Sequence, residues 1–270
     1  MRWENLTGKQ FEEAVIATNG VCVVPFGILE KHGDHLPLGT DMMIASGVAE
    51  KAAGIEPVVL FPDYLFGQNS GVKHWPGSLA FSGETQLRML KEICQEIRRN
   101  GFTKIIILNG HGGNNELIDF FLRTTLDEKK DYMVYGYWIL NLNAEQQRHL
   151  AGQCEAPDRE GHAGHLETAM IMHLRPKLVH MDRVKPGEWE PKGRGRWLRE
   201  HGLSSGINWY AEFPNHISGD PLRATADYGK TYTDMLADNF VKAIRRVKAD
   251  DALLRLQAEF FDQCDEVEKL

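Results

Sequence analysis

The sequence is poor in cysteine and has no long apolar run. Its four cysteines, Cys22, Cys94, Cys154 and Cys264, form no Cys-x-x-Cys pair. This scatter is typical of reduced thiols in a cytoplasmic protein and argues against a disulfide framework. No stretch approaches the ~20 apolar residues of a membrane helix, and residues 1–7 have no apolar core of a signal peptide. We therefore expect a cytoplasmic protein with no membrane partner.

Basic charge and phosphate-binding motifs are scarce as well. Lysine and arginine number 31 against 38 aspartates and glutamates, which gives a net charge of -7. Such a balance argues against a general binder of nucleic acid. Neither Gly-x-Gly-x-x-Gly nor Gly-x-x-x-x-Gly-Lys occurs. The sequence therefore shows no dinucleotide fingerprint and no P-loop.

Short apolar runs alternate with amphipathic stretches along the chain. The runs that predict buried strands are Val21–Phe26, Pro57–Phe61, Lys104–Asn109 and Tyr132–Ile139. The stretches that predict helices are Met42–Ala53, Thr85–Arg99, Asn115–Asp127, Thr233–Lys248 and Ala252–Val267. Strand and helix in alternation indicate right-handed βαβ units and a mostly parallel sheet covered on both faces. We expect residues 1–270 to form a single domain.

Residues 177–228 interrupt this alternation. Glycine and proline punctuate the segment, and it contains Trp189, Trp197 and Trp209. So long a connection is usually a lid, a binding loop or a disordered linker, and three tryptophans argue against disorder. Two readings stay open: the aromatic side chains contact the substrate, or they fill a subunit interface.

The richest chemistry lies in the run EKHGDHLPLGTD, from Glu30 to Asp41, directly after the first predicted strand. Glu30 and His32 are two residues apart, so on an extended segment both project from one face. Asp41 returns after a loop that contains Gly33, Pro37 and Gly39. Carboxylate and imidazole together suit Zn, Mn or Fe better than Ca or Mg. Asp41 is also expected to cap the helix that follows, so the metal reading competes with a structural one.

Two further motifs follow later strands. His111 stands between glycines in NGHGGN, after the third predicted strand, and is favoured as a fourth ligand because strand ends collect functional groups in parallel sheets. The segment GHAGHLETA opens a helix that is expected to run to about Leu174. Glu167 there can be a helix-start acid, whereas an imidazole such as His162 suits proton transfer near neutral pH.

Four segments together resemble the creatininase (creatinine amidohydrolase) family. They are PFGILEKHGDHLPLGTD, NGHGGN, HAGHLET and GDPLRATADYG, in the family's order from Val21 to Gly229. The resemblance implies a three-layer α/β/α fold, usually a homohexamer, with two divalent metal ions (Zn, Mn or Fe) per subunit. Glu30 and His111 would then bind one ion and His32 the other, with Asp41 bridging them. His162 would correspond to the catalytic histidine that transfers protons.

The chain departs from creatininase itself at an acidic ligand. Creatininase has a metal-binding glutamate two residues after the histidine that aligns with His111, and this chain has Gly113 there. Glu167, which matches a glutamate of other members, is the expected replacement. His165 stands where such members often have Glu, and Lys31 and Asp34 replace the familiar Gln and Pro. We therefore expect a substrate other than creatinine.

The resemblance predicts a hydrolase that acts on a small molecule. Water activated by the two metals would attack the carbonyl of a small cyclic amide or a formamide. The alternatives are a ring-opening carbon-carbon hydrolase of a keto-inositol (3-dehydro-scyllo-inosose type) and a metal-binding scaffold without catalysis. His74, Trp75 and Ser78, in HWPGS, lie where the family places a loop that faces the substrate. A Pro-Gly turn is the structural reading of the same residues.

Overall fold

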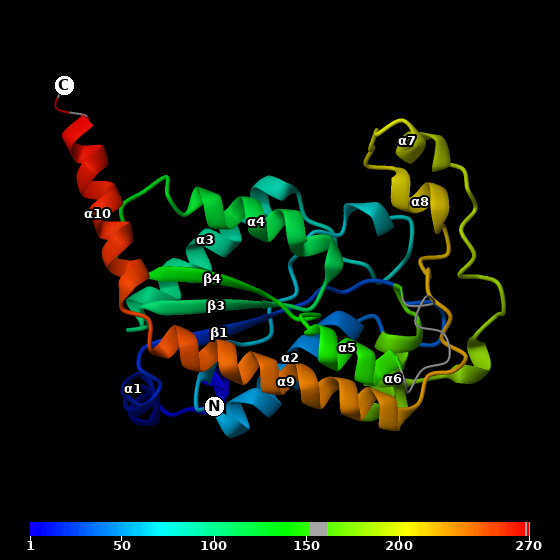
Figure 1. Cartoon of the computed structure of the whole chain (residues 1–270), viewed down its shortest axis with the longest axis horizontal. Helices are drawn as coiled ribbons and strands as arrows, with labels where there is room; N and C mark the ends of the chain where they lie inside the picture. The colour runs from blue at the N-terminus through cyan, green and yellow to red at the C-terminus, as the bar shows by residue number, and fades with distance from the viewer. Residues whose placement is uncertain (152–160, 268, 270) are drawn as a thin grey trace.

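A computed structural model describes residues 1–151, 161–267 and 269 (Figure 1). A four-stranded parallel sheet lies at its centre, in the order β2-β1-β3-β4. The strands are β1 (Val21–Phe26), β2 (Val59–Leu60), β3 (Lys104–Asn109) and β4 (Met133–Trp138). The predicted parallel sheet is confirmed. Cys154 lies outside the described residues, and the other three cysteines are free.

Strand β2 is shorter than the predicted run from Pro57 to Phe61. Only Val59 and Leu60 pair, with Cys22 and Val23 of β1. Proline donates no backbone hydrogen bond, so Pro57 and Pro62 limit the ladder on either side. A short edge strand results.

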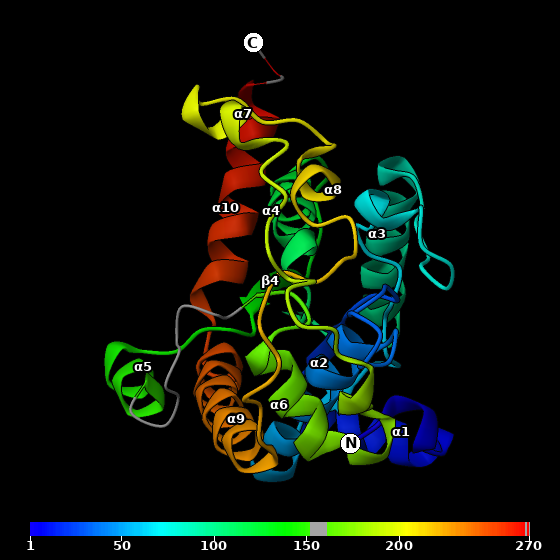
Figure 2. The same ribbon diagram turned by 90° about the vertical axis from the view of Figure 1, so that its right-hand side faces the viewer.

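Helices cover both faces of the sheet because alternate strand side chains point to opposite sides. Val21, Val23, Ile106 and Leu108 pack on one face. That face is covered by α2 (Thr40–Ile55), α6 (His165–Leu174) and α9 (Ala226–Lys248). Alternate residues of β1 and β3 face the other layer, made of α1 (Gly8–Ala17), α3 (Gly83–Arg99) and α4 (Asn115–Thr124). Figures 1 and 2 show the resulting three layers, which confirm the predicted α/β/α sandwich.

Smaller elements complete the described part of the chain. They are α5 (Ala144–Ala151), α7 (Arg196–Glu200), α8 (Asn208–Glu212), α10 (Ala252–Val267) and the 3-10 turns Trp3–Asn5, Ser70–Val72, Gly112–Asn114, Pro176–Leu178 and Met181–Arg183. Helices α7 and α8 belong to the segment 177–228, hereafter the arm, which lies at the right of Figure 1. No helix among the described residues is long and apolar enough to span a membrane.

Three helices begin earlier than predicted, and α3 starts at Gly83, two residues before the expected Thr85. Helix α9 starts at Ala226 because the Thr225 hydroxyl accepts a hydrogen bond from Tyr228 N at 3.2 Å. Helix α2 starts at Thr40, with Gly39 as its N-cap residue and no side-chain cap. The expectation that Asp41 caps this helix is therefore wrong. Because the helix begins one residue before it, the Asp41 side chain is free to point toward the histidines described below.

Helices α6 and α9 pack so closely that one position tolerates only glycine. A Cβ atom added at Gly229 would lie 1.9 Å from the carbonyl oxygen of Ala169. Gly229→Ala is expected to lower the free energy of unfolding by about 1–3 kcal/mol, because the two helices must move apart. Urea denaturation measures this change. Gly54→Ala, in α2 with nothing within 4 Å of the new Cβ, is the control and is expected to stabilise by up to ~1 kcal/mol. Equal stability of the two variants would contradict the close contact.

Candidate metal centre

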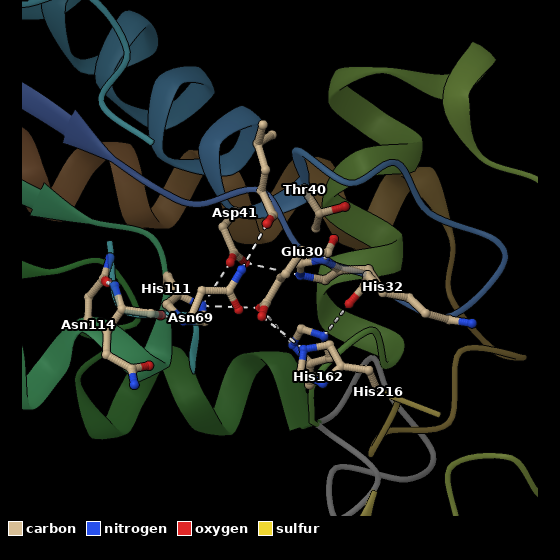
Figure 3. Close-up of polar contacts among 12 residues, drawn as sticks. Glu30, His32, Thr40, Asp41, Asn69, His111, Asn114, His162 and His216 are labelled. Carbon is tan, nitrogen blue, oxygen red and sulfur yellow. Dashed lines mark hydrogen bonds and ion pairs between the residues drawn. The ribbon is translucent and has the colours of Figure 1, made fainter. Parts of the chain in front are cut away.

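The predicted ligands meet at the carboxyl ends of two adjacent strands (Figure 3). Glu30 and His32 follow β1, His111 follows β3, and Asp41 lies in the first turn of α2. Glu30, His32 and Asp41 expose 2%, 0% and 1% of their surface. Parallel strands end at the same edge of a sheet, so groups that are distant in sequence converge there.

The converging side chains form two sets that share Asp41. In the first set, His111 Nδ1 lies 3.3 Å from Glu30 Oε1 and 2.8 Å from Asp41 Oδ2. In the second set, His32 Nε2 lies 3.1 Å from Asp41 Oδ1 and 3.7 Å from Glu167 Oε2. Each set therefore uses a different oxygen of Asp41. A carboxylate arranged in this way can bridge two ions.

The histidines are oriented as ligands. His32 Nδ1 lies 3.2 Å from the Glu30 carbonyl oxygen, and His111 Nε2 lies 3.2 Å from that of Gln68. A carbonyl only accepts, so these nitrogens carry the hydrogen in the neutral ring. With an ion bound and both rings neutral, the lone pairs of His32 Nε2 and His111 Nδ1 would face that ion beside the carboxylates. Histidines that bind metals commonly donate their second N–H to a backbone carbonyl in this way.

The carboxylates need a positive partner. Glu30 Oε1 and Asp41 Oδ2 are buried and accept no hydrogen bond. Burial raises the pKa of Glu30 well above its usual value, with His111 opposing the shift and Asp41 reinforcing it. Burial acts to raise the pKa of Asp41 too, but His32 and His111 outweigh it and hold that pKa well below its usual range. The mixed set of carboxylates and imidazoles fits Zn, Mn or Fe.

Burial and the nearby carboxylates also shift the pKa values of the imidazoles. Burial would lower the pKa of His32, but Asp41 outweighs it and raises this pKa to about 9. Burial likewise opposes a charge on His111, and Asp41 and Glu30 raise its pKa to about 8. Both rings thus favour a positive charge beside the carboxylates, and a bound cation supplies the same charge.

Glu167 lies where the second set needs an acid. Its Oε2 accepts the N–H of Ala163 at 2.6 Å, so it also satisfies an amide before α6, as predicted for a helix-start acid. A side chain at Gly113 would collide with His111, because a Cβ there would lie 2.5 Å from His111 Nε2. A side chain at position 113 would therefore require His111 to shift from this orientation.

Replacing Glu167 tests its place in the second set. Glu167→Gln keeps the size of the side chain and removes its charge, so the affinity for the second ion is expected to fall by at least the ~10–100-fold typical of second-sphere changes while the first is retained. Metal titration against a chelator measures both affinities. Glu116→Gln changes an exposed acid on the wall of the same cavity that belongs to neither set, and serves as control. An unchanged second affinity would leave Glu167 with its helix-start role alone.

His162 lies beside both sets. Its Nε2 is 2.8 Å from the Lys31 carbonyl oxygen and donates to it, so Nδ1 carries the lone pair. That nitrogen lies 3.5 Å from Glu30 Oε1. Burial and the neighbouring His32 and His216 lower the pKa of His162 well below its usual value. His162 is thus a neutral proton acceptor that faces the centre. It also forms a third possible ligand set with Glu30 and His32.

Sequence reasoning missed His216, which comes from the arm. Its Nε2 lies 2.8 Å from Glu30 Oε2, and it is 4% exposed. The available signal was a histidine three residues before the GDPLRATADYG motif. His216 has φ +56°, a left-handed conformation that is uncommon for residues with a side chain and is often found at functional sites.

The three arm tryptophans divide among different surroundings. Trp209 donates its Nε1–H to His216 Nδ1 at 2.5 Å and lines the cavity. Trp189 packs against the core, and Trp197 is 55% exposed. The prediction that the arm tryptophans contact the substrate therefore fits Trp209, which lines the cavity. The prediction that they fill a subunit interface fits Trp197, which is exposed.

The residues of HWPGS support the arm. Trp75 Nε1 donates to the Pro214 carbonyl oxygen at 2.9 Å, and His74 Nε2 lies 3.1 Å from the same oxygen. Ser78 Oγ is buried without a hydrogen bond. None of the three belongs to the cavity wall found among the described residues. Their contact with substrate stays a prediction.

Two other histidines stand apart from the ligand sets. His35 Nε2 lies 2.9 Å from Thr168 Oγ1, in the core below the site. The ring of His165 packs against Tyr228 with centroids 4.6 Å apart. His165, where relatives often have an acid, therefore serves packing in this chain.

The ligand cluster opens into a cavity of about 650 Å³. Glu30, His111, His162, Glu167 and His216 form part of its wall. Much of the rest is apolar and comes from Ile44, Val72, Ile139, Leu140, Leu166 and Met170. A ligand in this cavity would present a polar group to the cluster and an apolar part to these apolar side chains.

Comparison with known proteins identifies the family of the chain. A family model for creatininase, described as creatinine amidohydrolase, matches residues 4–244. The mycofactocin precursor peptide peptidase of Mycolicibacterium smegmatis is 28% identical over 234 residues, covering 84% of this chain and 85% of that protein. Creatinine amidohydrolase of Pseudomonas putida is 30% identical over 193 residues, covering 66% of this chain and 74% of that protein.

A relative with a different reaction and a solved structure extend the comparison. The 3-dehydro-scyllo-inosose hydrolase of Thermotoga maritima is 24% identical over 271 residues, covering 91% of this chain and 83% of that protein. A solved structure of creatininase with Mn superposes with a TM-score of 0.75 at 23% identity, covering 92% of this chain and 99% of that chain. The predicted resemblance is confirmed. The chain belongs to the creatininase family and is a metal-dependent hydrolase.

Proposed function

We propose that the chain holds two divalent ions and hydrolyses the C–N bond of a cyclic amide or formamide other than creatinine. Glu30, Asp41 and His111 would hold one ion, and His32, Asp41 and Glu167 the other. The observation that carries this proposal is Asp41, which offers one oxygen to each set. In the described part of the chain, Glu30 Oε1 and Asp41 Oδ2 accept no hydrogen bond and have only His111 as a charged partner nearby, which supports the need for cations.

The residues around the centre would have different roles in hydrolysis. Divalent ions bound here supply two effects: they lower the pKa of water from ~15.7 to about 7, and they polarise a carbonyl. His162 Nδ1 takes the proton of the attacking water and passes it to the leaving nitrogen. The Lys31 carbonyl holds the N–H on the far side of the ring, which keeps that lone pair directed into the site. Burial excludes bulk water from Glu30 and Asp41.

The cavity supports a substrate with more than a small polar ring. About 650 Å³ lies within the ~300–1,000 Å³ range of pockets that bury drug-sized ligands. Ile139, Leu140, Leu166 and Met170 would contact an apolar group larger than the single N-methyl group of creatinine. We propose that the scissile amide carries such a substituent.

One alternative reaction has specific support. The similarity to a 3-dehydro-scyllo-inosose hydrolase extends over 91% of this chain, so cleavage of a carbon-carbon bond in a cyclic ketone is the second candidate. The same residues would serve it, with His162 protonating carbon in place of nitrogen. A scaffold without catalysis is disfavoured because Glu167 supplies the acid that Gly113 lacks.

We also propose a cytoplasmic homo-oligomer, a hexamer by analogy with the family. Apolar side chains exposed on the arm and the last helix support assembly; Trp197, Ile207 and Phe260 are 55%, 60% and 43% exposed. Free Cys22, Cys94 and Cys264 are compatible with a reducing compartment. Light scattering measures the oligomer, and a monomer would contradict it.

Metal analysis followed by a substrate screen tests the function. Protein purified without chelator is expected to contain two equivalents of Zn, Mn or Fe per chain, and chelation should abolish hydrolysis. The screen contains lactams, formamides and cyclic ketones, each with Mn and with Zn. Turnover of cyclic ketones alone would favour the alternative reaction. Absence of metal from the purified protein and after reconstitution would overturn the proposed centre.

A further inference from the structure

A chain of two hydrogen bonds connects the arm to Glu30, and Figure 3 shows the second of them, between His216 and Glu30. Trp209 Nε1 lies 2.5 Å from His216 Nδ1, and His216 Nε2 lies 2.8 Å from Glu30 Oε2. An indole nitrogen only donates, so His216 Nδ1 must accept. The neutral ring then carries its hydrogen on Nε2, and this N–H donates to Glu30. Trp209 thus fixes the tautomer of His216.

This direction sets His216 apart from the other histidines of the site. His32, His111 and His162 each donate an N–H to a backbone carbonyl and turn a lone pair inward. His216 turns an N–H inward, and a protonated nitrogen cannot bind a metal. Among the described residues His216 also belongs to none of the ligand sets. Its contact is with a ligand, not with the ion.

The hydrogen bond from His216 determines which oxygen of Glu30 is free to bind an ion. Oε2 accepts from His216, while Oε1 has no hydrogen bond and lies 3.3 Å from His111 Nδ1. The last torsion of a glutamate side chain is soft, so the carboxylate could otherwise rotate. Without His216, Oε2 would also be buried without a partner, which is costly for a charged group.

We propose that His216 is a positioning residue that orients Glu30 to bind the first ion, and that Trp209 directs it. The proposal rests on the metal centre proposed above. It makes ion binding at the Glu30 and His111 site depend on the arm, whereas binding at the His32 and Glu167 site does not. The arm residues Pro214 and His216 are two apart, so the contacts of His74 and Trp75 with Pro214 help to hold the same segment.

Two substitutions at position 216 separate the donor role from a merely structural one. His216→Asn accommodates the left-handed backbone, but its amide nitrogen reaches only as far as Nδ1 and cannot contact Glu30. His216→Gln reaches as far as Nε2 and restores a donor. His216→Asn is expected to weaken the first ion ~10–100-fold with the second unchanged, and His216→Gln to bring the affinity back toward that of the wild type.

Trp209→Phe provides a second variant that leaves His216 in place. It keeps an aromatic ring and removes the donor, so the first ion should bind more weakly than in the wild type but more tightly than in His216→Asn. Trp197→Phe, an exposed residue of the same arm, and His201→Ala, whose ring contacts the carbonyl oxygen of Trp197 within the arm, are the matched controls. Both controls should bind two ions as the wild type does.

Zn²⁺ titration of the full chain against a chelator gives the two affinities, and circular dichroism reports folding. Wild-type affinity for both ions in folded His216→Asn and Trp209→Phe would overturn the positioning role. Equal loss in His216→Gln and His216→Asn would show that the imidazole itself is required, which overturns the donor role. A wild-type chain that binds no ion would overturn the metal centre, and this inference with it.

Discussion

Asp41→Ala is expected to lose both metal ions and all measurable hydrolysis. Asp41 is the one side chain shared by the two ligand sets, with Oδ1 at 3.1 Å from His32 and Oδ2 at 2.8 Å from His111. Its removal leaves each set with one carboxylate and one imidazole, too few ligands to hold an ion tightly. Metal content after gel filtration measures the loss. Second-sphere changes typically reduce affinity only ~10–100-fold, so a bridging role predicts a larger effect than any other substitution here.

A control for Asp41 lies in the same loop. Asp34 is a partly exposed acid that pairs with Lys31 and Lys185 and belongs to no ligand set. Asp34→Ala should retain two ions. If Asp41→Ala keeps one ion per chain, Asp41 belongs to a single site and the bridge does not exist.

His162→Gln is expected to retain both ions and to lower turnover by ~100-fold or more, as for the loss of a general acid-base group. The lone pair of His162 Nδ1 points into the cluster, and His162 belongs to neither of the two ligand sets that share Asp41. Steady-state kinetics with the substrate found in the screen measure the loss, and metal analysis of the same sample shows the occupancy. His180→Ala, an exposed histidine outside the site, is the control.

The alternative for His162 is a ligand role, because Glu30, His32 and His162 also form a possible set. In that case His162→Gln would lose an ion together with turnover. Turnover at the wild-type rate would remove His162 from the reaction altogether. The pair of measurements therefore distinguishes proton transfer, metal binding and structure.

The strand-end ligands could be anticipated because they depend on local rules. Glu30, His32 and Asp41 fall within one loop after a buried strand, so few conformations separate them. His111 could be added because parallel strands end at one edge of the sheet. The helix that follows this loop is longer than predicted by two residues at each end, and at its start Gly39 takes the N-cap position and leaves Asp41 free.

The arm could not be placed from its sequence. His216 is 186 residues from Glu30, and no spacing rule connects them. Nothing in the sequence distinguishes the three tryptophans of the arm, Trp189, Trp197 and Trp209. Only the packing of the arm directs Trp209 to His216. Glu167 could not be assigned from the sequence for the same reason. Its role as a metal ligand or as a helix-start acid depends on how close His32 lies to the start of α6.

The sequence by itself determined the sheet, the family and the kinds of side chain available to bind metal, because these follow from short-range periodicity and from motifs within single loops. The tertiary structure alone decided which oxygen of Asp41 faces which histidine, how the ring of His111 lies over position 113, and how the arm contacts Glu30. These features depend on contacts between segments far apart in the chain. Hydrogen-bond direction at His32, His111, His162 and His216 is set by such contacts, and it separates the three histidines with inward lone pairs from the one with an inward N–H.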